Sequence, residues 1–144
     1  MPKIEKITKQ TENPYVNLYL VEGKNKVDHL FRYYVASRAK TMEALKIKTK
    51  KNTPDGVLMY SLYGEKRDKI VLVRQYRVSI DDYIYEFPAG LVESGEELHE
   101  AAVREMHEET GLTFHPLKVD PCYEKPFFTT IGMTDEACSA VYGW

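Results

Sequence analysis

The stretch REMHEETGL, residues 104–112, decides how this chain folds and carries its densest cluster of charge. On a helix, Glu105, Glu108 and Glu109 stand at positions i, i+3 and i+4, so their carboxylates leave from one face. Like charges this close repel each other. Either the face is solvated and the repulsion is tolerated, or a hard cation such as Mg²⁺ neutralises it through oxygen ligands.

A long helix is predicted around this stretch. Ser94 and Glu97 have the S-x-x-E spacing of a capping box, and no glycine or proline follows Glu97 until Gly111, a good helix stop. Apolar residues recur at three- and four-residue steps and are expected to pack on a sheet: Leu98, Ala101, Ala102 and Met106. The acidic face then lies at the edge of the core, which favours a binding site over a solvated surface.

Length and composition predict one globular domain over residues 1–144, since 43% of the residues are hydrophobic and 29% charged. The net charge of −2 gives no general attraction to nucleic acid or to an anionic membrane, so neither is expected as a partner. No apolar run reaches the roughly 18 residues that span a bilayer, and the first ten residues hold no signal-peptide core, so the cytoplasm is expected. Cys122 and Cys138 are expected to be ordinary thiols.

Four segments rich in Val, Leu and Tyr are predicted as strands, starting at Tyr15, His29, Gly56 and Lys69. Turn-forming residues separate them, and the connections before the third and fourth strands have hairpin-like spacing. A mixed or antiparallel sheet follows. Residues 39–52, between the second and third strands, fit a helical turn followed by a basic strand, and their form stays open.

Loop and helix together have a distinctive spacing: Gly90, five residues, Glu96, seven residues, Arg104-Glu105-Met106, one residue, Glu108-Glu109, one residue, Gly111-Leu112. This resembles the signature of the Nudix hydrolases, G-x5-E-x7-R-E-U-x-E-E-x-G-U with U apolar, and every fixed position matches. A chance match has a probability on the order of one in a million or less at ordinary amino-acid usage. The signature is therefore a very specific signal.

The resemblance implies an α/β fold, an α/β/α sandwich around a mixed sheet, with the box loop and helix at the active site. It implies hydrolysis of a nucleoside diphosphate linked to another group, with Mg²⁺ or Mn²⁺ as cofactor. In the family the glutamates matching Glu105, Glu108 and Glu109 hold the metal, and the main-chain carbonyl matching that of Ala89 joins them. Hard oxygen ligands of this kind suit Mg²⁺, which activates water and offsets phosphoryl charge.

Two other charged residues of the box have both local and family readings. Arg104 either forms an ion pair with Glu108 at i+4 on the helix surface or orients a box glutamate, as its family counterpart does. Glu96 is either favoured by the helix dipole in the first turn or is the supporting acid of the family. Gly90 matches the first box glycine and allows a tight loop.

Segments outside the box resemble the ADP-ribose pyrophosphatase branch: VRQYR, YEFPAG and TTIGMTDE. Arg77 and Glu86 match substrate-site residues of that branch, and their local readings are an edge-strand cation and a buried paired acid. Glu136 matches a glutamate proposed to activate the attacking water, and is otherwise a loop acid at a strand entry. Relatives place a basic residue ahead of the third strand against the substrate phosphates, and Lys48 or Lys50 could serve here, although short basic runs are usually solvated.

One departure weakens the substrate assignment. The branch commonly carries a serine-proline-glycine run before the acid, and here the run is Thr130-Ile131-Gly132, without proline. A hydrolase for nucleoside triphosphates therefore remains an alternative. A Nudix-like domain that senses nucleotides without cutting them is another, although such a domain is expected to lose box carboxylates, and none is lost here.

The N-terminal strands, about residues 1–52, are expected to form a homodimer as in the resembled branch, with Tyr15 or Tyr19 as candidates to stack on adenine. Relatives usually continue into a closing helix, whereas this chain stops at Trp144, in or just after a strand. The closing helix is therefore expected to be absent, from a shortened chain or a short gene product.

Overall fold

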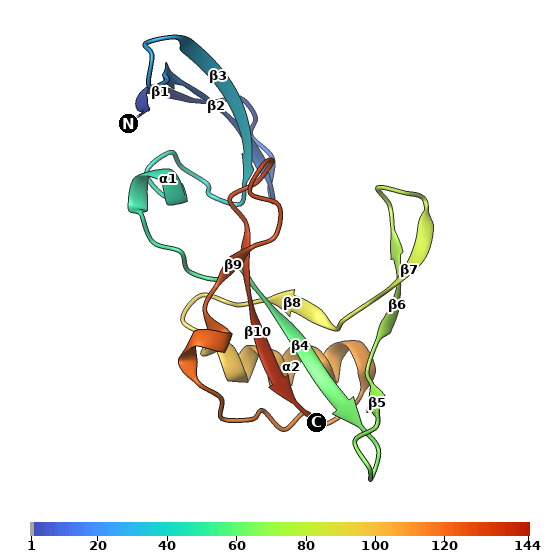
Figure 1. The fold of residues 1–144 in the computed structure, drawn as a ribbon. Coiled ribbons are helices and arrows are strands. Elements are labelled where there is room, and N and C mark those ends of the chain that lie inside the picture. Colours follow the sequence, from blue (N-terminus) through green and yellow to red (C-terminus); the bar gives the residue numbers. More distant parts are fainter. Residues whose placement is uncertain (1) are drawn as a thin grey trace. The chain divides into compact units, whose positions relative to one another are not determined.

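The structure is a computed structural model, and it describes residues 2–144. It divides into two compact units, each formed by two segments of the chain. Unit 1 comprises residues up to Thr53 together with 128–136, and unit 2 comprises 54–127 together with 137–144. Figure 1 shows the elements of both units in chain order. No helix within residues 2–144 is long and apolar enough to cross a membrane.

Unit 1 is built on an antiparallel sheet in the order β1-β2-β3. Its elements are β1 (Lys3–Lys9), β2 (Asn17–Lys24), β3 (Leu30–Ser37) and one turn of helix, α1 (Lys46–Thr49). The central strand β2 is the most buried, because it has a neighbour on each side. Tyr19, Leu20 and Val21 of β2 form the small core of this unit with Leu45, which precedes α1.

Unit 2 contains most of a five-stranded mixed sheet. Its strands are β4 (Gly56–Tyr63), β5 (Lys69–Ile70), β8 (Ala89–Leu91), β9 (Phe127–Phe128) and β10 (Ala137–Gly143). The order is β5-β4-β10-β9, with β8 also paired to β4. β10 runs parallel to β4, whereas β5 and β8 pair with β4 in antiparallel fashion. This confirms the mixed sheet and the α/β class expected from the sequence.

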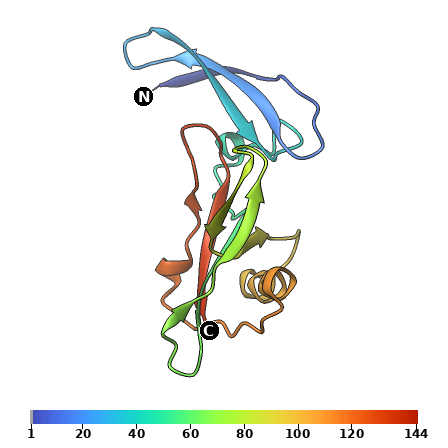
Figure 2. The same ribbon diagram turned by 90° about the vertical axis from the view of Figure 1, so that its right-hand side faces the viewer.

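Unit 2 has four further elements. β6 (Val73–Arg77) and β7 (Asp82–Glu86) form a separate two-stranded antiparallel hairpin. The long helix α2 (Leu98–Thr110) packs beside β4, β8 and β10, and Figure 2 views it nearly end on. A 3₁₀ turn, η1 (Pro121–Glu124), follows before β9.

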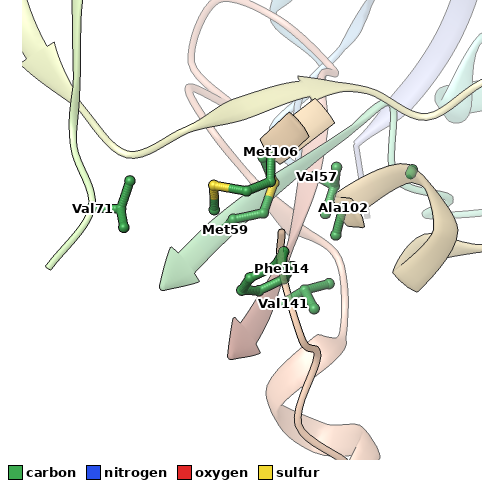
Figure 3. Packing of buried hydrophobic residues seen from close by; sticks show 8 residues of the cluster. Val57, Met59, Val71, Ala102, Met106, Phe114 and Val141 are labelled. Atoms are coloured by element: carbon green, nitrogen blue, oxygen red, sulfur yellow. The ribbon is translucent and has the colours of Figure 1, made fainter. Parts of the chain in front are cut away.

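Helix and sheet meet in the core shown in Figure 3. Val57 and Met59 of β4 and Val141 of β10 point toward α2, and all three are fully buried. From α2, the predicted residues Ala101, Ala102 and Met106 complete the cluster with no exposed surface, and Leu98 packs against it partly buried. The apolar periodicity of the sequence therefore predicted the buried face of α2 correctly.

The four predicted strands formed, with one change of extent, whereas β1, β7, β8 and β9 were not predicted. The segment from Lys69 is split into β5 and β6, since Val71 and Leu72 do not pair as strand residues. β1 was not predicted, because KIEKITK is mostly charged and becomes a strand only by pairing with β2. The connection before β5 is a hairpin, as expected, whereas α1 and a loop precede β4, so the hairpin expected there is wrong. Residues 39–52 form turns and α1 without a basic strand.

The ends of α2 agree only in part with the prediction. Gly111 ends the helix in the left-handed conformation, at φ 71°, and donates its N–H to the His107 carbonyl over 2.8 Å. The capping box is wrong, because the N-cap is Glu97, which makes no side-chain cap hydrogen bond. A turn precedes the helix instead, in which the Glu96 N–H bonds to the Glu93 carbonyl, 3.1 Å away, and Gly95 has φ +84°.

Two glycines of unit 2 differ in what a methyl group would meet. At Gly143, a Cβ would overlap the backbone carbonyl of His115 and the ring of Phe114. At Gly90, it would overlap only the carboxylate of Glu105, the far end of a flexible side chain. We expect Gly143→Ala to lower the free energy of unfolding by about 1–3 kcal/mol through overpacking, and Gly90→Ala to lower it much less. Denaturant midpoints measure both changes. Equal losses of stability in the two variants would contradict the interpretation that the Glu105 side chain can move away from a methyl group at position 90.

Candidate active site

The loop between β7 and α2 brings backbone against the acidic face of the helix. Glu105 lies with its carboxylate directly over Gly90, in the space that a Cβ would occupy. Its side chain is only 14% exposed. The first box glycine is therefore needed for close approach, because any side chain at position 90 would displace Glu105.

Glu109, one turn further along α2, also reaches this loop. Its carboxylate accepts a hydrogen bond from the Ala89 N–H over 3.1 Å. The residue is exposed, yet the carboxylate turns inward, and its partial burial is the main cause that raises the pKa of Glu109. The Ala89 N–H and nearby Arg77 act in the opposite direction, while Glu105 and Glu86 add to the rise. Two carboxylates thus converge on the backbone of Ala89 and Gly90, the part of the box loop where β8 begins.

Arg104 binds the other acidic groups of the box. Its Nε and Nη2 hold both carboxylate oxygens of Glu96 over 2.8 and 2.9 Å. Its Nη1 donates to Glu105 over 2.9 Å and to Glu108 over 3.3 Å, and Nη2 also donates to the Leu91 carbonyl over 3.0 Å. The contacts are compatible with both interpretations of Arg104, because it pairs with Glu108 on the helix surface and also bonds to Glu105.

Glu96 lies before α2, so the expected position in the first helical turn is wrong. Its carboxylate bonds to Arg104 and to the Glu93 N–H, which is 2.9 Å away. Arg104 and the Glu93 N–H together lower the pKa of Glu96 to about 2. Glu96 is therefore a permanent anion at neutral pH, and it joins the loop to the helix through Arg104. The Glu108 side chain is 56% exposed, which makes it far more open than that of Glu105.

Arg77 and Glu86 lie on the β6–β7 hairpin and bind each other. The Arg77 Nε is 3.0 Å from both carboxylate oxygens of Glu86, and a second bond joins Nη2 to Glu86. The hydrogen bonds that Arg77 donates to Glu86 are the main cause that raises the pKa of Arg77, and Glu109 contributes through its charge. The hairpin thus presents a cation within electrostatic reach of Glu109.

Two predicted residues belong to unit 1, so the structure does not place them relative to the box. Glu136 accepts a hydrogen bond from the Arg38 Nε over 2.8 Å. Arg38 was missed by the sequence reasoning, because an arginine at a strand end carries no motif. Lys48 lies exposed on α1.

The donors on the acidic face fit a hard divalent cation. Glu105, Glu108 and Glu109 offer carboxylate oxygens, and Ala89 adds a main-chain carbonyl on the same loop, which is the ligand chemistry of Mg²⁺ or Mn²⁺. Within residues 2–144, no three His, Cys, Asp or Glu side chains stand close enough to form a ready-made ligand set. Arg104 draws Glu105 and Glu108 to itself, so binding would require these side chains to turn.

The amino-acid sequence is similar to those of several known pyrophosphatases. The chain is 35% identical over 80 residues to an ADP-ribose pyrophosphatase of Saccharomyces cerevisiae, covering 54% of this chain and 35% of that protein. It is 44% identical over 61 residues to an ADP-ribose pyrophosphatase of Bacillus subtilis, covering 42% and 33%. An ADP-sugar pyrophosphatase of Mus musculus is 36% identical over 77 residues, covering 51% and 35%. The matched stretch spans about a third of each relative.

A solved structure shows the same fold. A crystal structure described as an ADP compounds hydrolase superposes with a TM-score of 0.73 at 19% identity, covering 99% of this chain and 66% of that one. The NUDIX domain family matches residues 52–142, which contain the whole signature and the loop and helix that carry it. Because this match covers more than half of the chain, the protein belongs to the Nudix family of pyrophosphohydrolases.

Proposed function

We propose that this protein hydrolyses the diphosphate of a nucleoside diphosphate linked to another group, with ADP-ribose or a related nucleoside diphosphate sugar as substrate. The observation that carries the proposal is the convergence of Glu105 and Glu109 on the Ala89–Gly90 loop, within electrostatic reach of Arg77. The printed names of the relatives point to the same substrates. The products are a nucleoside monophosphate and a sugar phosphate.

Glu105, Glu108, Glu109 and the Ala89 carbonyl would hold Mg²⁺ or Mn²⁺. When bound, the cation supplies an activated water and offsets the negative charge of the diphosphate. Arg104 bonds to Glu105 and holds its side chain beside the box loop, and Glu96 holds Arg104 in place. Gly90 leaves room for the Glu105 carboxylate. No covalent intermediate is needed, since the box contains no serine or cysteine at a reacting position.

Arg77 has a separate task in this proposal. Its guanidinium provides planar, charge-assisted donors, which suit the oxygens of a diphosphate. Glu86 holds the guanidinium in orientation through its bonds to Nε and Nη2. Lys48 would add a second positive charge against the phosphates.

Glu136 is proposed as the base that accepts a proton from the attacking water. Its carboxylate is half-buried and held by Arg38, which keeps it in one orientation. A base needs this positioning as well as a suitable pKa.

The first prediction of this proposal concerns the metal. Glu109→Gln keeps the shape and the acceptor for the Ala89 N–H but removes one charge from the acidic face. We expect turnover to fall by orders of magnitude and the rise in Tm with millimolar Mg²⁺ or Mn²⁺ to shrink or vanish, because a cation bound only by the folded state stabilises it. When EDTA removes the metal, the Glu109→Gln variant is expected to have a Tm no lower than that of the wild type. Full turnover at saturating Mg²⁺ would remove Glu109 from the site.

The second prediction concerns the reaction. Hydrolysis of ADP-ribose in ¹⁸O-water should place one label on one of the two phosphates and none on the other. Glu136→Gln should slow the reaction about 10²-fold or more, since a positioned base contributes at least that much. Wild-type speed in this variant would place the base elsewhere. A strong preference for triphosphates would reject the assigned substrate, and binding without cleavage would indicate a sensor domain.

The third prediction concerns assembly. Unit 1 exposes apolar side chains on β3 and on the connections before β2 and β3: Tyr15, Val27, Leu30, Tyr33 and Tyr34. Large exposed apolar patches usually mark interaction surfaces, so we propose a homodimer formed through unit 1. Light scattering at micromolar concentration should report two chains, and a fully active monomer would contradict this. Tyr19 is buried and bonds to the Ala39 carbonyl, which leaves Tyr15 as the candidate to stack on adenine.

A further inference from the structure

Strand β6 has two faces with different surroundings. Side chains alternate along a strand, so Val73, Gln75 and Arg77 share one face, and Arg74 and Tyr76 share the other. Val73 and Gln75 are half-buried, whereas Arg74 and Tyr76 are exposed. The exposed face is engaged with a partner on β7. Arg74 lies 4.1 Å from the centroid of the Tyr83 ring, and the rings of Tyr76 and Tyr83 are 5.3 Å apart.

The half-buried face of β6 borders a pocket beside the acidic face of α2. Val73, Gln75 and Glu109 line a cavity of about 190 Å³. Pockets for whole drug-sized ligands run from about 300 Å³ upward. The pocket therefore fits one group of a larger substrate, such as a pentose or a hydrated ion.

The lining chemistry favours a neutral, hydroxyl-bearing group. The amide of Gln75 suits such a group, because it both donates hydrogen bonds to hydroxyls and accepts hydrogen bonds from them. Val73 supplies an apolar wall for the carbon face of a sugar. Arg77, two residues further along the same face, carries the positive charge that a phosphate needs. A sugar phosphate placed along β6 would thus meet Arg77 with its phosphate and Gln75 with its hydroxyls.

Gln75 has hydrogen-bonding capacity to spare. Among residues 2–144, its side-chain amide forms no hydrogen bond with another group of the protein. A half-buried amide of this kind has two donors and an acceptor available to a ligand. We propose that Gln75 is a specificity-determining residue whose amide hydrogen-bonds a sugar hydroxyl of the substrate in the pocket beside Glu109. This inference rests on the function proposed above and adds a residue that selects the sugar.

The test removes the Gln75 amide from the protein and, separately, the sugar hydroxyls from the substrate. Gln75→Leu keeps the approximate size of the side chain without polar atoms, and Tyr76→Phe, on the opposite face of the same strand, is the matched control. Three substrates are compared: ADP-ribose, the methyl ester of ADP, which lacks the second sugar, and 2′,3′-dideoxy-ADP-ribose, which lacks the hydroxyls of the nucleoside sugar. Binding of α,β-methylene ADP-ribose, followed by calorimetry, gives a readout independent of turnover.

We expect Gln75→Leu to lower kcat/KM for ADP-ribose about three- to tenfold, the worth of one neutral hydrogen bond, and to weaken binding of the methylene analogue similarly. The penalty should disappear on one of the two altered substrates, which identifies the sugar that Gln75 contacts. Tyr76→Phe should change neither quantity by more than about twofold, since it keeps the ring contact with Tyr83.

An equal penalty on all three substrates, or none on any, would overturn the inference, because a residue that acts only on the fold does not distinguish hydroxyls. Denaturant midpoints of Gln75→Leu and the wild type check that the comparison is made on folded protein. A wild-type protein that cleaves none of the three substrates would refute the proposed function instead, so the two failures are distinguishable.

Discussion

One guanidinium joins the loop before α2 to the acidic face of the helix. Arg104 donates to both oxygens of Glu96, to Glu105, to Glu108 and to the Leu91 carbonyl. The planar fork of arginine allows these bonds at once, which the ammonium of lysine would not. These bonds join α2 to Glu96 in the loop before the helix and to Leu91 at the end of β8. The position of Glu105 over Gly90, and with it the geometry of the candidate site, depends on this contact.

The same contact leaves an imbalance of charge. Arg104 offsets part of the charge of Glu96, Glu105 and Glu108, while Glu109 lies outside its reach and carries a raised pKa through partial burial and the nearby Glu105. Arg77 is the cation that acts on Glu109, and it is already bound to Glu86. Partial burial of the Glu109 carboxylate costs folding free energy, because a charge loses part of its hydration there. A bound divalent cation would offset the charge of Glu109, and an anionic substrate would offset that of Arg77.

The two compact units divide the candidate residues in an unexpected way. The NUDIX match begins at residue 52, near the start of unit 2, and runs to residue 142. Residues 128–136 lie inside this match and yet belong to unit 1. Glu136 therefore packs with the N-terminal strands through Arg38, although the family signature lies in unit 2.

The amino-acid sequence determined the features that depend on near neighbours. The spacing of Glu105, Glu108 and Glu109 set their common face, the apolar period set the buried side of α2, and Gly111 set its end, because each follows from the geometry of a single helix. The family signature added the identity of the box loop. Local propensity also found the cores of β2, β3 and β4.

Tertiary structure decided what depends on residues far apart in the chain. Arg38 and Glu136 meet across 98 positions, β1 becomes a strand only against β2, and Gln75 reaches the pocket beside Glu109 through the fold of the hairpin. The local spacing rule gave a wrong prediction at the start of α2. Glu96 binds Arg104 there, and a turn is present in place of the capping box. The physical reason is that such contacts form only after the chain closes long loops, and sequence spacing does not encode which loops close.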